Sequence, residues 1–226
     1  MEAEQLTLGL PYRPALGRED FLIANSNRAA IEFIDSWPDW HEPVAIIYGP
    51  KSCGKTHILN VWRSKTGAVE LTREDLTPDR LETTLDQVPG NFTLDNLEDL
   101  ISAGSAEQHA VFHLINEIRN KGGTLLCTTR TAPAEWSVAL KDLESRMKAA
   151  HILSIDMPDD DLLFAIFVKL FHDRQISVDP EMIQFLLSRC DRSFDTVFSM
   201  VEKIDAASLQ EKRRITLPFI KKVLSL

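Results

Sequence analysis

Eight residues at positions 49–56 have the types and the order that suit the binding of phosphate groups. They read Gly-Pro-Lys-Ser-Cys-Gly-Lys-Thr and complete the pattern G-x-x-x-x-G-K-T. Glycines let the backbone curl so that successive N–H groups face a β-phosphate, Lys55 can reach β- and γ-phosphate oxygens, and Thr56 can offer its hydroxyl to Mg²⁺. We therefore predict an ATP or ADP site. Its phosphate-contacting residues are Gly49, Pro50, Lys51, Ser52, Cys53, Gly54, Lys55, Thr56 and His57.

An acidic residue follows an apolar segment further along the chain. Phe92-Thr93-Leu94 reads as a short strand, and Asp95 comes directly after it. Because Mg²⁺ bound to phosphates prefers oxygen ligands, Thr56 and Asp95 are the predicted metal residues. The alternative is that Asp95 only caps the end of the strand.

Apolar segments that alternate with helical patterns should form the sheet that positions these residues. Such alternation predicts the α/β class, with a parallel five-stranded core. The helix before the fourth strand should begin at Ser105, with Gln108 completing a capping box, and end at Gly122-Gly123. The expected strands are 44–48, 68–71, 92–94, 124–128 and 151–155.

The strand signal stops after Ile155, and the remaining segments have helical spacing. We expect a small all-helical lid domain, because ligands of parallel sheets bind beyond the carboxyl ends of the strands, where a lid can close. The expected helices span 159–173, 180–189, 193–209 and 218–224. The expected units are an extended arm at 1–20, a nucleotide-binding α/β domain at 21–156 and the lid at 157–226.

Composition narrows the classes of partner. The chain has 226 residues, is 44% hydrophobic and carries a formal net charge of −9, so its average surface repels DNA and anionic membranes. Three cysteines without metal-type spacing suit a reducing compartment, and no signal peptide or membrane-spanning segment is evident. These features predict a cytoplasmic protein whose partners are a nucleotide and other proteins.

Five segments together resemble the DnaA family of AAA+ ATPases, and within it the Hda group most. The resemblance runs from about Phe21 to the C-terminus, without the helix-turn-helix domain with which DnaA reads origin DNA; we therefore expect no sequence-specific DNA-binding domain. The segments are Gly49–His57, Leu94-Asp95-Asn96-Leu97-Glu98, Leu126-Cys127-Thr128-Thr129-Arg130, Asp142-Leu143-Glu144-Ser145-Arg146-Met147 and Cys190-Asp191-Arg192-Ser193.

The resemblance implies roles for two arginines. Arg146 matches the arginine finger, which in such assemblies acts on the nucleotide of a neighbouring subunit. Arg192 matches the lid arginine that touches the phosphates of its own subunit. The alternatives are a surface arginine at a helix end for Arg146, and a first-turn residue held by a neighbouring aspartate for Arg192.

The resemblance also implies three further groups of site residues. Thr129 matches a sensor position near the γ-phosphate, with Thr128 as the adjacent alternative. Asn96 stands where many AAA+ proteins have Asp or Glu to polarise the attacking water, so this chain lacks a general base there. Leu22 and Ile23 resemble residues that pack around the adenine; alternatively they are core residues before a helix capped by Asn25 or Ser26.

The N-terminal arm contains a candidate docking motif. Gln5-Leu6-Thr7-Leu8-Gly9-Leu10 resembles the motif with which Hda proteins bind the sliding clamp of DNA polymerase III. Gln5 would supply an amide for hydrogen bonds, and Leu6, Leu8 and Leu10 would supply apolar side chains for pockets. The alternating leucines equally fit a strand on the edge of the sheet.

Three functions are compatible with the sequence. The resemblance implies a regulator that is bound to the clamp, presents Arg146 to ATP held by DnaA and so restrains the initiation of replication. An alternative is a self-contained AAA+ ATPase or loader that hydrolyses its own ATP while it assembles on another replication protein. A homo-oligomer of the chain is also compatible with the sequence. A third is a binding module in which the nucleotide only stabilises the fold.

Overall fold

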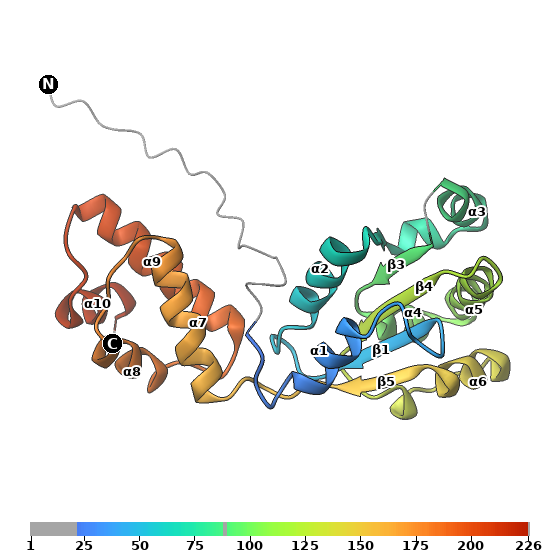
Figure 1. Cartoon of the computed structure of the whole chain (residues 1–226), viewed down its shortest axis with the longest axis horizontal. Helices are drawn as coiled ribbons and strands as arrows, with labels where there is room; N and C mark the ends of the chain where they lie inside the picture. The colour runs from blue at the N-terminus through green and yellow to red at the C-terminus, as the bar shows by residue number, and fades with distance from the viewer. Residues whose placement is uncertain (1–21, 88–89, 226) are drawn as a thin grey trace, which may run out of the picture.

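Five parallel strands form one sheet in the order β2-β3-β4-β1-β5. The computed structural model describes residues 22–87 and 90–225 (Figure 1). Apolar runs such as Val44-Ala45-Ile46-Ile47, in an interior strand, are buried on both faces of the sheet, as parallel sheets require. The expected strands are confirmed, with ends shifted by one residue at most. The strands are β1 (Val44–Tyr48), β2 (Val69–Leu71), β3 (Asn91–Leu94), β4 (Thr124–Thr129) and β5 (His151–Ser154).

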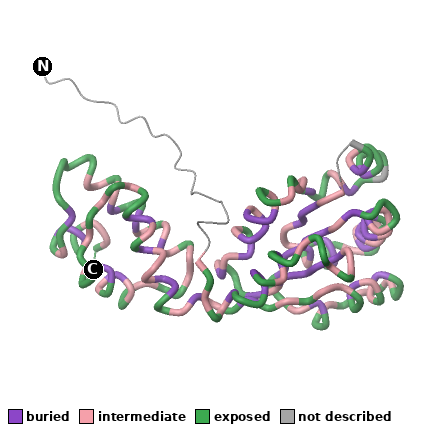
Figure 2. Tube along the Cα trace, viewed as in Figure 1, coloured by how far each residue is buried: buried purple, intermediate pink, exposed green. Residues whose placement is uncertain are grey.

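Helices cover both faces of this sheet and give the α/β domain two apolar cores. Ala45, Ile47 and Leu126 point into a core shared with α1 and α2, whereas Ile46 and Leu125 point into the core on the opposite face. The buried positions follow the strands and the inner sides of these helices (Figure 2). The helices are α1 (Arg28–Asp35), α2 (Lys55–Thr66), α3 (Pro78–Gln87), α4 (Leu97–Ala103), α5 (Ser105–Asn120) and α6 (Lys141–Ala149), with short 3₁₀ turns η2 (Arg73–Leu76) and η3 (Pro133–Glu135).

A separate helical domain follows the sheet, as expected. Its own core is formed by buried side chains of all its helices, Phe167, Phe171 and Ile220 among them. Side-chain caps begin three of the four helices, for example Asp159, whose carboxylate accepts a hydrogen bond from Leu162 N at 2.8 Å. The helices are α7 (Asp160–Asp173), α8 (Pro180–Leu187), α9 (Phe194–Glu211) and α10 (Leu217–Leu224). Within the described residues we find no helix with the length and apolar character that crossing a bilayer requires.

The expected capping box at Ser105 is wrong. The short helix α4 directly precedes α5, so the cap position falls on Gly104 and Ser105 is already the first helical residue. Gln108 is instead buried and joins three segments. Its amide donates to Ile101 O at 3.0 Å, and its carbonyl oxygen accepts hydrogen bonds from the backbone N–H groups of Ala139 and Leu140.

Candidate functional site

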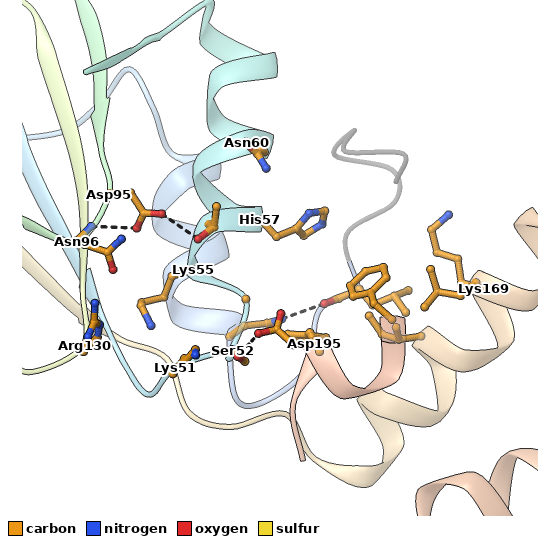
Figure 3. Close-up of a pocket in the computed structure, with 18 of the residues that line it drawn as sticks. Lys51, Ser52, Lys55, His57, Asn60, Asp95, Asn96, Arg130, Lys169 and Asp195 are labelled. Carbon is orange, nitrogen blue, oxygen red and sulfur yellow. Dashed lines mark hydrogen bonds between the residues drawn. The ribbon is translucent and has the colours of Figure 1, made fainter. Parts of the chain in front are cut away.

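A cavity of about 530 Å³ lies between the carboxyl ends of the strands and the helical domain. Residues from both domains line it, and Figure 3 shows many of them. Of the predicted nucleotide and metal residues, Leu22, Lys51, Ser52, Gly54, Lys55, Thr56, His57 and Asp95 line the cavity, and so does Asn96 of the predicted catalytic residues. Further lining residues that sequence reasoning did not single out are Asn27, Asn60, Arg130, Ile166, Lys169, Leu170, Asp173, Phe194, Asp195 and Phe198.

The loop at 49–56 connects β1 to α2 and turns back on itself. Ser52 and Gly54 have φ angles of 62° and 100°, which lie in the left-handed region. Lys55 begins α2, and its ammonium lies inside the loop, donating to Gly49 O at 2.7 Å and Pro50 O at 2.6 Å. A lysine charge at the N-terminus of a helix, enclosed by a glycine-rich loop, suits the binding of phosphate oxygens.

Gly49 lies outside the cavity and is needed for a close approach of two strands. A Cβ atom added at Gly49 would stand 2.2 Å from the carbonyl oxygen of Ile155. The Ile155 N–H also donates to Tyr48 O at 2.8 Å, which ties the end of β1 to the chain that leaves β5. The first glycine of the motif therefore fixes where the loop starts.

Two oxygen-bearing side chains from different elements meet below the loop. The Thr56 hydroxyl donates to Asp95 Oδ2 at 3.0 Å. Asp95 Oδ1 accepts hydrogen bonds from Asn96 N at 3.0 Å and from the Thr128 hydroxyl at the end of β4. Within the described residues there is no cluster of three or more His, Cys, Asp or Glu side chains that could hold a metal by themselves. A hydroxyl and a carboxylate nevertheless suit Mg²⁺, which keeps waters and takes further oxygens from phosphates.

The side chains of the two adjacent threonines of β4 point in opposite directions. Both threonines are buried and neither lines the cavity, but the Thr128 hydroxyl donates to Asp95, whereas the Thr129 hydroxyl donates to Thr131 O at 2.8 Å. This follows from the alternation of side chains along a strand. Of the two sensor candidates, Thr128 is therefore the one that lies next to the Thr56–Asp95 pair.

Asn96 and Arg130 complete the sheet side of the cavity. Asn96 has a φ of 54° and is the cap residue before α4, and its side chain is an amide that cannot take up a proton near neutral pH. Arg130 follows β4 directly and pairs with Glu98 at 3.2 Å and with Asp99 at 3.4 Å. Its position after a strand end was the signal that could have marked it, because the carboxyl ends of parallel strands share one edge.

The lid side of the cavity is built by the first turns of α9 and by α7. Phe194 N donates to Ser52 O at 3.2 Å, and the Ser52 hydroxyl donates to the carboxylate of Asp195 (Figure 3). A Cβ atom at Gly54 would stand only 2.8 Å from the ring of Phe194. With Phe198, Ile166 and other apolar side chains, the lid supplies a surface that suits a flat base.

The two predicted arginines do not line this cavity. The Arg192 side chain is 65% exposed and pairs with Asp160 at 3.1 Å. It precedes the Ser193 cap of α9, so it lies outside the first turn that faces the loop, and Asp195 is the charged residue there. Arg146 lies on α6, at the opposite end of the sheet from the cavity (Figure 1).

The segment before α1 places one of its two predicted residues at the cavity. Leu22 lines the cavity, whereas Ile23 is exposed, with 43% of its surface accessible to solvent. The cap of α1 is Asn27 rather than Asn25 or Ser26. Asn27 is buried, accepts a hydrogen bond from Ala24 N at 2.9 Å and donates to Leu22 O at 3.0 Å, so it holds Leu22 in position.

Cys53 lies inside the phosphate loop and is buried. Its burial raises the pKa of the thiol above its usual value, and the nearby Lys55 charge only partly offsets this effect. The thiol therefore stays protonated near neutral pH and adds no negative charge to the loop. The arm residues Gln5, Leu6, Leu8 and Leu10 lie outside the described residues.

Comparisons with known proteins bear on these observations. Residues 159–224 match the family described as Hda, lid domain. A Haemophilus influenzae protein described as uncharacterised is 31% identical over 196 residues, which is 83% of this chain and 84% of that protein.

Solved structures resemble the whole fold. Domain III of the replication initiation protein DnaA from Thermotoga maritima superposes with a TM-score of 0.77 at 18% identity, covering 96% of this chain and 98% of that one. AMPPCP-bound DnaA from Aquifex aeolicus gives 0.73 at 19% identity, over 88% of this chain and 67% of that one. Thermotoga maritima RuvB gives 0.73 at 15% identity, over 92% and 70% of the two chains.

Proposed function

The chain belongs to the DnaA/Hda-like AAA+ proteins, and on this premise we propose that it binds ADP or ATP between its two domains and negatively regulates the initiation of DNA replication. In this proposal it promotes hydrolysis of ATP bound to DnaA, in complex with the sliding clamp. The observation that carries the nucleotide part is the cavity in which the phosphate loop, the Thr56–Asp95 pair and the lid helix α9 meet.

Each part of the cavity has a role in binding. Lys55 and the N-terminus of α2 receive the phosphates, while the apolar lid surface around Phe198 and Ile166 packs against the base. Thr56 and Asp95 would hold Mg²⁺, which would neutralise phosphate charge when bound. The hydrogen bonds from Thr128 and from the backbone of Asn96 orient Asp95 toward that position.

The chain's own hydrolysis should be weak. Water that attacks a γ-phosphate is activated by a carboxylate in many such sites, and Asn96 offers an amide instead. Glu98 is engaged, since its Oε1 accepts a hydrogen bond from Arg130 N at 3.0 Å and pairs with the Arg130 guanidinium. These contacts favour a protein that holds its nucleotide and acts on the nucleotide of a partner.

Arg146 is the residue through which it would act on DnaA. Its half-exposed side chain forms no hydrogen bond or ion pair with the described part of the chain, and α6 lies away from the chain's own cavity. A guanidinium placed in this way can be presented to another subunit, where an arginine supplied in trans contributes about 10³ to 10⁵ in rate.

The test is the single-turnover hydrolysis of ATP on DnaA in the presence of this protein, clamp and DNA. Arg146→Ala should lose the stimulation by about 10³-fold or more while its ADP affinity stays unchanged. Lys148→Ala, which removes a positive charge from the same helix two residues further on, is the matched control and should stimulate like wild type. Full stimulation by Arg146→Ala would refute this role, and steady hydrolysis by this protein alone would favour a self-contained ATPase or loader.

The nucleotide part is tested separately by calorimetry. Lys55→Ala removes the charge at the phosphates and should abolish tight binding of ADP and ATP, with Lys148→Ala again as control. Equal affinities for wild type and Lys55→Ala would refute the proposed site.

Clamp binding rests on the sequence of the arm alone. We propose that Gln5 and Leu6 contact the clamp, because a glutamine and alternating leucines suit an extended peptide in a pocketed groove. Replacing both by alanine should abolish clamp binding in a pull-down and leave ADP affinity intact. Wild-type clamp binding by this double variant would assign the arm to a structural role.

A further inference from the structure

The end of the helical domain carries a concentration of positive charge in an otherwise acidic chain. From Lys203 to the C-terminus the sequence has six lysines and arginines but only two acidic residues, whereas the whole chain has a formal net charge of −9. The cations of this stretch from position 212 onward are all exposed, and so is Arg189, which follows α8. We call these residues the basic patch; they are Arg189, Lys212, Arg213, Arg214, Lys221 and Lys222.

Two members of the basic patch meet at one aromatic ring. The Arg189 guanidinium carbon lies 3.9 Å, and the Lys221 ammonium 5.2 Å, from the centre of the half-buried Phe185 ring. Both distances are within the range of cation–π attraction, which positions the two charges without neutralising them. The end of α8 and the middle of α10 therefore present their positive charges together.

One carboxylate lies among the other cations of the patch. Lys222 Nζ donates to Glu211 Oε1 at 2.7 Å, and Arg213 Nη1 lies 3.8 Å from Glu211 Oε2. Within the described residues, no acidic side chain pairs with Lys212 or Arg214. A single negative charge is thus set against the six positive charges, and the patch keeps a clear excess of positive charge.

The basic patch lies far from the acidic part of the chain. Helix α9 begins against the phosphate loop, where Phe194 N donates to Ser52 O, and its 18 residues end at Glu211. The helix spans about 27 Å, roughly three times the distance over which salt at about 0.1 M screens charges. Accordingly, α10 and this end of α9 lie at the end of the molecule furthest from the sheet (Figure 1). A polyanion bound there is therefore hardly repelled by residues 1–156, which hold 23 of the 34 acidic residues.

We propose that the basic patch binds the phosphate backbone of double-stranded DNA without reading its sequence. The proposal goes beyond the regulatory function proposed above and does not depend on it. Lysine and arginine are the main side chains that contact DNA phosphates, and such contacts carry no sequence information. The patch places six exposed cations on neighbouring segments, so that several phosphates of one duplex can be neutralised together.

A protein partner suits this surface less well than DNA does. The centres of protein interfaces are depleted of charged residues and enriched in large apolar ones. Within the described part of α8, α9 and α10, Leu209 is the only large hydrophobic side chain that is exposed. The patch therefore lacks the apolar centre that a stable protein interface needs, whereas DNA phosphates need only the charges.

The experiment measures the fluorescence anisotropy of a labelled duplex of about 20 base pairs with the full chain, over a series of NaCl concentrations. Wild type should bind weakly, with a Kd of roughly 10⁻⁵ M at low salt, and two duplexes of unrelated sequence should bind equally well. With about four phosphates neutralised, a plot of log Ka against log [NaCl] should have a slope of about −3.6.

Matched double variants locate the binding. Lys212→Gln/Arg214→Gln removes two charges without leaving a paired carboxylate behind, and should weaken binding by about tenfold and make the slope less steep by about two. Lys141→Gln/Lys148→Gln removes the same charge from exposed positions of α6 in the α/β domain and should bind DNA like wild type. Lys221→Gln gives a second test on a different helix, with the slope less steep by about one.

Three results would overturn the proposal. Wild type may not lose its DNA at high salt alone: it must bind at low salt, and no binding there ends the argument. An equal loss of affinity in both double variants would indicate an effect of net charge, and displacement of the duplex by poly-glutamate as readily as by unlabelled DNA would assign the patch to acidic peptides. Adding ADP should leave the DNA affinity unchanged, because the cavity is about 27 Å away. Failure of the proposed nucleotide site would therefore not alter the result.

Discussion

Replacing Gly49 with alanine tests whether the first glycine of the phosphate loop serves a close backbone approach rather than an unusual backbone angle. A Cβ atom at this position would stand 2.2 Å from Ile155 O and 3.2 Å from Ile155 C. Carbon and carbonyl oxygen meet at roughly 3.3 Å, so the two backbones must separate by about 1 Å. Neither contact is the end of a flexible side chain that could swing away.

The cost of this separation can be worked from the contacts on both sides. Forcing an extra carbon into a packed position costs about 1 to 3 kcal/mol. Weakening the hydrogen bond from Ile155 N to Tyr48 O, which is 2.8 Å long, adds about 1 kcal/mol. We therefore expect Gly49→Ala to lower the free energy of unfolding of the α/β domain by about 2 to 4 kcal/mol.

Tryptophan fluorescence during urea unfolding is a suitable assay, because all four tryptophans lie in the α/β domain and none in the lid. Gly67→Ala is the matched control: Gly67 has a φ of 70°, and an added Cβ there meets nothing within 4 Å. Its cost should be the left-handed backbone alone, about 1 to 2 kcal/mol. If Gly49→Ala unfolds at the wild-type midpoint, or Gly67→Ala proves the more damaging, the close-approach argument is wrong.

Two further predictions concern the site, and a third concerns a thiol of the lid. Thr56→Val removes the hydroxyl next to Asp95, so the gain in ATP affinity on adding Mg²⁺ should disappear. The ATP affinity measured in EDTA should stay within about twofold of wild type. An unchanged gain on adding Mg²⁺ would exclude Thr56 as a ligand. Asn96→Asp adds a carboxylate that tolerates the same backbone angle, and it should raise the chain's own ATP hydrolysis, measured as phosphate release, by about 10²-fold. An unchanged rate would show that the amide of Asn96 does not limit hydrolysis. Burial raises the pKa of Cys190 to about 11, so its thiolate is scarce at pH 8, and its alkylation by iodoacetamide, followed by mass spectrometry, should rise about tenfold per pH unit between roughly pH 8 and 10. A rate that levels off below about pH 10 would contradict the raised pKa.

The parts of the fold that could be predicted are those with local signals. The five strands and four lid helices show their hydrophobic periods within short windows, and the phosphate loop is a contiguous motif between a strand and a helix. Asp95 could be identified because it directly follows a strand that is visible in the sequence, and the end of that strand fixes where Asp95 lies in the sheet. Helix α4 was missed because it is short and its cap residue, Asn96, has a left-handed backbone and makes no side-chain capping hydrogen bond.

The lid side of the site could not be predicted in the same way. Arg192 and Asp195 are three residues apart, and which of them faces the loop depends on where α9 begins and how the lid packs on the other domain. A sequence pattern gives the start of α9 only to within a residue or two, and it does not show how the lid packs on the α/β domain. The same holds for Phe194 and Phe198, whose spacing shows a helix face but not that this face meets the loop.

The strand order also has a consequence for synthesis of the chain on the ribosome. β1 carries the phosphate loop and β3 carries Asp95, but β4 lies between them in the sheet and is made after both. A nascent chain that ends before residue 124 therefore contains the whole glycine-rich motif and the acidic strand end, yet has nothing to bring the two side by side. Insertion of β4 closes that gap and delivers Thr128 to Asp95 in the same event. We expect nucleotide affinity to emerge abruptly during translation, so that a bound nucleotide marks a sheet in which β4 is in place.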